Sequence, residues 1–122
     1  MDKSHYNKKT GDYGENLAAN YLEQKGYRIL ERNFRIGKGE VDIVAKDEDT
    51  LAFIEVKTCT VSNFGEPETW VTRRKQKQIG KIASGYLQKH DLQDVDCRFD
   101  VVAITFKKDQ AHIHLIKDAF WL

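Results

Sequence analysis

Residues 38–58, with the sequence KGEVDIVAKDEDTLAFIEVKT, place the strongest constraint on the fold of this chain. Two segments rich in Val, Ile and Phe, residues 40–46 and 51–58, flank the acidic cluster 47–50. β-Branched and aromatic residues favour strands, and a polar connection of four residues is an ordinary hairpin length. The stretch therefore predicts a β-hairpin around which the other elements assemble.

A symmetric turn in this hairpin would fix which residues face one another. Counting outward from it places Asp42 opposite Glu55 and Glu40 opposite Lys57. Because side chains alternate across a strand, each face of the hairpin can be predicted. One face is expected to be wholly apolar, with Val41, Ile43, Ala45, Ala52, Ile54 and Val56. The other is expected to hold Val44, Leu51 and Phe53 near the turn and Glu40, Asp42, Glu55 and Lys57 at the open end.

The predicted placement of Asp42 opposite Glu55 needs a physical explanation. Directly opposed side chains have Cβ atoms about 4.5 to 5.5 Å apart, and like charges at that spacing are destabilising. A divalent cation would relieve the repulsion, since magnesium is bound by carboxylate oxygens together with water and phosphate. Lys57 could then orient or help to deprotonate a water, or contact a phosphate. The alternative left open is an edge cluster in which Lys57 pairs with Glu40 and both acids reach solvent.

Apolar residues at helical spacing predict a helix before this hairpin. It is expected to run from Thr10, as its N-cap, to Lys25, with Gly26 ending it, and residues 1–9 are expected to form a loose arm. Glu15 lies near the start of this helix, where the helix dipole favours a carboxylate in any protein. A functional role for it requires this end of the helix to lean over the charged end of the hairpin.

A second helix is predicted from a Thr72 cap to about Lys89. Its first turns carry five cations: Arg73, Arg74, Lys75, Lys77 and Lys81. Cations at a helix N-terminus oppose the dipole, so local stability does not explain them, whereas binding of a polyanion would. The net charge of the whole chain is only +1, so affinity for nucleic acid would have to come from this local patch. A solvated basic face is the alternative.

The remaining segments complete a single α/β domain. Strands are expected over residues 27–36, 97–106 and 111–116, and a loop over residues 59–68 at the open end of the hairpin. The element order is then α-β-β-β-α-β-β, with a central mixed sheet of about five strands flanked by helices. The two cysteines match no zinc spacing and no run reaches membrane-spanning length, which favours a reducing cytoplasm and no membrane partner.

Five separated motifs bring in a resemblance that extends from Gly14 to Phe120: GENLAANYLEQKGYRILERNFR, GEVDIVAKD, FIEVKT, FGEPETWVTRRKQKQI and RFDVVAI. Together they resemble the YraN family of uncharacterised bacterial proteins. An acid in the first helix, an acid on the second strand and Glu-x-Lys on the third also resemble the PD-(D/E)xK nuclease superfamily, especially archaeal Holliday junction resolvases. The resemblance implies a restriction-endonuclease-like fold and one nuclease-like domain over residues 10–122.

The resemblance also implies roles for particular residues. Asp42 and Glu55 would bind Mg²⁺ or Mn²⁺ with the main-chain carbonyl of Val56, Lys57 would be the catalytic lysine, and Glu15 would complete the site. The cations implied to neutralise DNA phosphates are Arg73, Arg74, Lys75 and Lys77.

The expected activity is metal-dependent endonucleolytic hydrolysis of structured or branched DNA in repair or recombination. One alternative is an accessory module that keeps the nuclease fold and binds nucleic acid without cleaving it. Another is a structural protein that uses the basic helix and the Phe120-Trp121 tail. Formation of a homodimer is left open.

Overall fold

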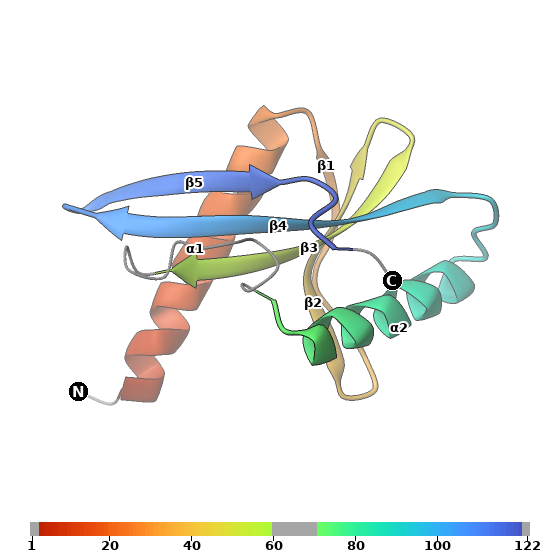
Figure 1. Ribbon diagram of the computed structural model, residues 1–122, viewed down its shortest axis with the longest axis horizontal. Helices are drawn as coiled ribbons and strands as arrows, with labels where there is room; N and C mark the ends of the chain where they lie inside the picture. Colours follow the sequence, from red (N-terminus) through yellow and green to blue (C-terminus); the bar gives the residue numbers. More distant parts are fainter. Residues whose placement is uncertain (1–2, 60–70, 121–122) are drawn as a thin grey trace.

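The computed structural model describes the backbone of residues 3–59 and 71–120 and the side chains of residues 13–58 and 71–120. Within these residues the chain forms two helices and five strands (Figure 1). In chain order they are α1 (Lys3–Gln24), β1 (Arg28–Ile36), β2 (Gly39–Asp47), β3 (Thr50–Cys59), α2 (Arg73–Lys89), β4 (Asp96–Lys107) and β5 (Gln110–Ile116). The predicted order α-β-β-β-α-β-β is confirmed. The predicted loop over residues 59–68 lies, apart from Cys59, outside the described residues.

The five strands form one mixed sheet in the order β1-β2-β3-β4-β5. Neighbouring strands are antiparallel except β3 and β4, which run parallel. A parallel neighbour requires a crossover connection, and α2 lies in that connection. Figure 1 shows α1 crossing behind the sheet, and α2 covers the opposite face.

Each face of the sheet carries its own core. The core under α2 includes Val41, Val44, Phe53, Ile79, Ile82, Tyr86, Val101 and Ala103. The core under α1 includes Ala18, Leu22, Ile43, Ala45, Ala52, Ile54, Val102 and Ile104. Because the central strands are covered on both faces, their side chains are apolar on both sides instead of alternating with polar residues.

The helix boundaries agree with the sequence at three of four ends. Thr72 caps α2 by accepting a hydrogen bond from the Lys75 amide at 3.1 Å, and α2 ends at Lys89 as predicted. Gly26, with φ of 96°, follows α1. The predicted start of α1 was wrong, because the helix begins at Lys3 and residues 3–9 belong to it instead of forming a loose arm. The start at Thr10 was predicted from the apolar stripe of the helix. Once nucleated, a helix can extend beyond that stripe, because each added residue gains a hydrogen bond.

A buried polar network ties the far end of the sheet together. Asp100 is fully buried, and its carboxylate accepts hydrogen bonds from Arg98 Nε at 2.8 Å, the Asp118 amide at 2.9 Å and the Tyr27 hydroxyl at 3.1 Å. These hydrogen bonds replace those that the Asp100 carboxylate would make with water, and so offset the cost of burying it. The network therefore joins the end of α1, β4 and the C-terminal segment.

The C-terminal segment packs on the domain as far as it is described. Phe120 is buried and stacks on Phe99 with ring centroids 5.1 Å apart, while the Ala119 amide donates to the Phe99 carbonyl at 2.7 Å. Across the described residues, neither helix is apolar enough over a sufficient length to cross a bilayer.

Candidate active site

The hairpin register was predicted correctly, and it ends just before the acids. Val44 pairs with Phe53 and Ile43 with Ile54, as expected. The turn itself is tighter than predicted, because Asp47 still pairs with Thr50 and only two residues connect the strands. Beyond Ile43 the ladder stops, and Figure 1 shows β2 and β3 separating.

Asp42 lies where the two strands separate. In place of a ladder pair with Glu55, its Oδ2 accepts a hydrogen bond from the main-chain N–H of Val56 at 2.8 Å. Burial raises the pKa of the Asp42 carboxyl, while the hydrogen bond from Val56, a hydrogen bond with the Glu55 side chain and the charge of Lys75 act to lower it. The carboxyl is thus held in a fixed position by a donor on the neighbouring strand.

On both β1 and β2, side chains two residues apart point to opposite faces of the sheet at the level of Asp42. Ile43 packs under α1 but Val41 packs under α2, so the predicted apolar face was wrong at Val41. On β1, Arg32 faces α1 and Phe34 faces α2, and Asn33 between them has a φ of 54°. A residue in the left-handed region breaks the two-residue alternation of a strand, and strict alternation was the basis of the prediction.

Glu55 carries the largest electrostatic perturbation of the site. Its Oε1 is buried and accepts no hydrogen bond within the described part of the chain. Burial, followed by the charge of Asp42, raises the pKa of Glu55 to about 8, and the nearby charge of Lys75 acts in the opposite direction. An acid with a buried, unsatisfied oxygen beside a second acid is a place where a cation would be stabilising.

Glu15 joins these acids from α1. The helix comes close to the end of β3, since a Cβ added to Gly14 would lie 3.1 Å from Thr58 Oγ1. Glu15 is buried, and its pKa is raised by burial and next by the charge of Asp42. The helix therefore leans over the open end of the hairpin, which was the condition for a functional Glu15.

Two β1 residues that sequence reasoning missed hold Glu15 in place. Arg32 Nη2 donates to Glu15 Oε1 at 3.2 Å, and Asn33 Nδ2 donates to the same oxygen at 2.9 Å. An Asn inside a predicted strand was the available signal, because Asn is depleted in regular strands and tolerates a positive φ.

Lys75 lies inside the site and not on the outer basic face where the sequence prediction grouped it. Its Nζ is 3.9 Å from Glu55 Oε2 and donates to the Glu40 carbonyl at 3.0 Å and to Gln78 Oε1 at 3.1 Å. Glu40 itself pairs with Arg35 at 3.1 Å. Helical periodicity indicates which residues share a face of α2. It does not indicate that the face with Lys75 meets the ends of β2 and β3.

Lys57 completes a small hollow beside the acids. Glu55, Val56, Lys57 and Lys75 line a cavity of about 220 Å³, with Val71 and Thr72 at its other side. The exposed Lys57 and the half-buried Lys75 therefore bring two ammonium groups to one edge of the carboxylate site. The predicted set of Glu15, Asp42, Glu55 and Lys57 is gathered in one region of the fold.

The donor set fits a hard divalent cation. Two carboxylates and a main-chain carbonyl are the oxygen ligands that magnesium and manganese accept, with waters filling the other positions. The described residues contain no group of three or more His, Cys, Asp or Glu side chains arranged to hold a metal. Asp42 and Glu55 therefore remain the candidate side-chain ligands, with the Val56 carbonyl as the predicted third ligand.

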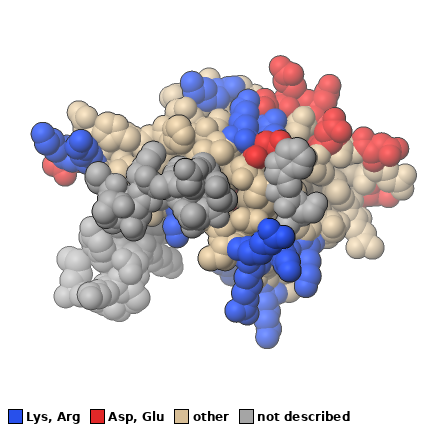
Figure 2. Space-filling model, viewed as in Figure 1, with Lys and Arg blue, Asp and Glu red and all other residues tan. Residues whose placement is uncertain are grey.

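A basic surface lies next to this site. Its exposed cations are Arg73, Arg74, Lys77 and Lys81 on α2. Figure 2 shows Lys and Arg side chains gathered over the start of α2, well separated from the acidic side chains near the β2–β3 turn. The side chains predicted to contact phosphate thus share one surface, except for Lys75.

A search of solved structures gives a weak match to SfsA of Pyrococcus furiosus, whose structure is described as a complex with Ca²⁺. The match has a TM-score of 0.36 and 14% identity, and it covers 91% of this chain and 62% of that one, so this chain spans less than two thirds of SfsA. A similarity at this level carries no weight in assigning the site.

Sequence comparisons give a much stronger result. A UPF0102 protein of Syntrophus aciditrophicus is 49% identical over 116 residues, covering 95% of this chain and 91% of the relative. One from Geobacter sulfurreducens is 51% identical over 120 residues, covering 98% and 94%, and one from Clostridium perfringens is 43% identical over 117 residues, covering 94% and 96%. The model of the uncharacterised protein family UPF0102, which is YraN-like, matches residues 14–104. The chain therefore belongs to the UPF0102 family.

Proposed function

We propose that this protein is a metal-dependent endonuclease that hydrolyses phosphodiester bonds in structured or branched DNA with Mg²⁺ or Mn²⁺. The observation that carries the proposal is the buried Oε1 of Glu55, which lacks a partner within the described residues and belongs to an acid whose neighbour is Asp42. Two such carboxylates cost stability unless a cation binds them. The resemblance to archaeal Holliday junction resolvases supports branched DNA as the substrate.

Each residue of the site would have a separate role in hydrolysis. A bound divalent ion would supply a Lewis acid for the non-bridging phosphate oxygen and lower the pKa of water. The Lys57 ammonium, at the edge of the hollow, would orient the attacking water. Glu15, which Arg32 and Asn33 fix in position, would polarise a water on the α1 side of Asp42. Exposed cations of α2 would hold flanking phosphates.

The second candidate is a nucleic-acid-binding accessory module that does not cleave. One observation favours it, namely the Lys75 ammonium 3.9 Å from Glu55, which supplies a positive charge to the acids from the protein itself. A site neutralised in this way would be stable without a metal ion. The two candidates differ in whether added metal produces cleavage.

Incubation of the purified protein with junction, flap and single-stranded DNA and Mn²⁺ tests the proposal. We expect cleavage by the wild type and a loss of at least about a hundredfold in Asp42→Asn, because the metal would lose a charged ligand. Asp96→Asn, at an exposed position of β4, is the matched control and should cleave normally. Equal cleavage by Asp42→Asn and wild type would refute catalysis at this site, and absence of cleavage by both would favour the accessory module.

Binding of the metal can be tested separately by thermal unfolding. A ligand that binds only the folded state raises the melting temperature, by an amount that grows with the logarithm of the ligand concentration divided by Kd. We expect Mn²⁺ to raise the melting temperature of the wild type and to have a smaller effect on Glu55→Gln. An undiminished shift in that variant would exclude Glu55 as a ligand.

A further inference from the structure

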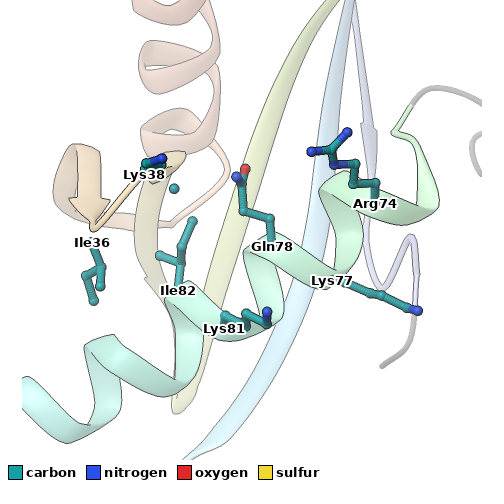
Figure 3. Close-up of a pocket in the computed structure, with 8 residues that line it drawn as sticks. Ile36, Lys38, Arg74, Lys77, Gln78, Lys81 and Ile82 are labelled. Atoms are coloured by element: carbon teal, nitrogen blue, oxygen red, sulfur yellow. The ribbon is translucent and has the colours of Figure 1, made fainter.

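A groove runs between α2 and the turn that connects β1 to β2 (Figure 3). Its volume is about 430 Å³. Lys38 on the turn forms one wall, Arg74, Lys77 and Lys81 on α2 form the other, and Ile36 and Ile82 contribute apolar surface. The groove thus has a cation on each side, whereas the sequence had indicated only the cations of α2.

Two reciprocal contacts hold the walls of this groove together. Ile82 of α2 packs on Gly39 of β2, where an added Cβ would lie 2.9 Å from Ile82 Cδ1. In the opposite direction, Ile36 of β1 packs on Gly85 of α2, where an added Cβ would contact Ile36 Cδ1. Each glycine allows the other element to approach closely, so the groove is a rigid feature of the packing.

The charge of the groove selects a polyanion. None of the lining residues in the part of the chain that the structure describes is acidic. Within residues 13–58 and 71–120, none of Lys38, Arg74, Lys77 and Lys81 forms an ion pair. Four like charges around one groove repel one another, and a chain of phosphates would neutralise them and release its own counterions.

The lining of the groove also indicates how such a chain would lie. Among the described residues no aromatic ring lines the groove, so base stacking has no partner there, and recognition would involve the sugar-phosphate backbone. A hollow of about 430 Å³ between two protein walls admits one strand, whereas a duplex would contact only the rim.

The groove leads to the carboxylates. Gln78 lines it, and Gln78 Oε1 accepts a hydrogen bond from Lys75 Nζ at 3.1 Å. The same Nζ lies 3.9 Å from Glu55 Oε2, so one side chain separates the groove from the candidate active site. A strand leaving the groove on this side would pass the acids.

We propose that this groove binds the backbone of a single-stranded nucleic-acid segment and directs it to Asp42 and Glu55. The direction toward the acids rests on the proposed function, whereas binding in the groove does not. The substrate class is accordingly a DNA with a free or splayed single strand, such as a flap or the open branch of a junction.

Binding of fluorescein-labelled oligo(dT) at several salt concentrations in EDTA tests the groove with cleavage suppressed. The variant is Lys38→Ala with Lys81→Ala, and its charge-matched control is Lys46→Ala with Lys107→Ala, which removes two exposed lysines outside the groove. Each phosphate contact on a single strand contributes about 0.7 to the slope of log affinity against log salt. We expect the groove variant to lose about 1.4 from that slope and the control to lose almost none.

A slope for the groove variant equal to that of its control would overturn the proposal. So would a loss on a blunt duplex as large as the loss on oligo(dT), because that result would assign the cations to duplex binding. If the variant does not fold, Arg74→Ala with Lys77→Ala removes two cations from the opposite wall and should give the same slope change. Because no metal is present, a failed nuclease assay leaves these outcomes unaffected, and failed binding here leaves cleavage to be judged separately.

Discussion

The Lys75 ammonium lies 3.9 Å from Glu55 Oε2 while it donates to the Glu40 carbonyl at 3.0 Å. A lysine anchored by one strand and directed at an acid on the next strand acts as a permanent counter-charge. It lowers the pKa of Glu55 against the larger effects of burial and Asp42. Lys75 also lines the 220 Å³ hollow through which a divalent cation would approach Glu55.

Lys75→Met should therefore tighten Mn²⁺ binding. A cation within about 4 Å of a carboxylate repels a second cation there, and its removal should raise affinity by roughly tenfold. The measurement is calorimetric titration with Mn²⁺ at several pH values, because removal of Lys75 also raises the pKa of Glu55 and so increases competition by protons. Lys77→Met, an exposed lysine on the same helix, should bind Mn²⁺ as the wild type does. Weaker binding by Lys75→Met would show that Lys75 supports the metal site instead of competing with it.

The raised pKa of Glu55 predicts a pH dependence of stability. Its folded value of about 8 exceeds the ordinary 4.5, so between these pH values the unfolded state has released a proton that the folded state keeps. The free energy of unfolding should therefore fall as pH rises from 4.5 to 8. Glu55→Gln cannot ionise, and it should be more stable than the wild type above pH 8 by on the order of a few kcal/mol. Urea unfolding across this range measures the difference.

The control for this experiment is Glu48→Gln, which changes an exposed acid in the β2–β3 turn. Its stability should follow the wild-type pH profile. Parallel profiles for Glu55→Gln and wild type would mean that Glu55 titrates at its ordinary pKa.

Gly85→Ala should destabilise the protein although Ala is the better helix former. The added Cβ would contact Ile36 Cδ1, and overpacking costs about 1 to 3 kcal/mol against a gain of about 1 kcal/mol in helix propensity. Ile36→Val removes that methyl group, so Gly85→Ala with Ile36→Val should recover most of the loss. Denaturant unfolding of both single variants and the double variant gives the coupling energy. Additive effects would show that the two residues are not in contact.

Asp100→Asn should unfold the protein readily without touching the site. Asp100 is fully buried and its Oδ1 pairs with Arg98 Nε at 2.8 Å. Arg98 would keep its ion pair with Asp47 at 2.9 Å, but the donors that face the buried Asp100 carboxylate would lose a charged acceptor, which costs about 1 to 3 kcal/mol. Asp96→Asn, exposed on the same strand, should be neutral. A loss of stability below about 1 kcal/mol would mean that water or another group replaces the lost charge.

The sequence was informative wherever local rules act alone. The hairpin pairing from Lys46–Leu51 to Ile43–Ile54 follows from a symmetric turn between two apolar strands, and that register survives although the turn is shorter than expected. Thr72 and Gly26 were found because capping chemistry depends on one or two residues. Asp42, Glu55 and Lys57 could be placed near one another because the hairpin register puts Asp42 beside Glu55 and two-residue spacing puts Lys57 on the same face; their roles stay a prediction.

The features that could not be predicted from the sequence depend on how the helices pack against the strands. Val41 lies in the opposite core from Ile43, and Asn33 on the paired strand has a positive φ; period-two counting has no means of detecting such a break. Lys75 was assigned to phosphate because helical spacing does not reveal that one cation of five is directed inward at Glu55. Lys38 was not singled out at all, since its proximity to α2 depends on two glycine contacts between distant segments.

The change of side at Asn33 and Asp42 has a mechanical consequence. Beyond these residues, β1, β2 and their connecting turn pack on α2 through Ile36 and Gly39, and their pairing with β3 has ended. The two strand ends are therefore supported by α2 and no longer by β3. Asp42 lies at the residue where one support replaces the other, and its carboxyl is held there by the Val56 amide. The position of this acid thus depends on the packing of a helix that lies on the far side of the turn.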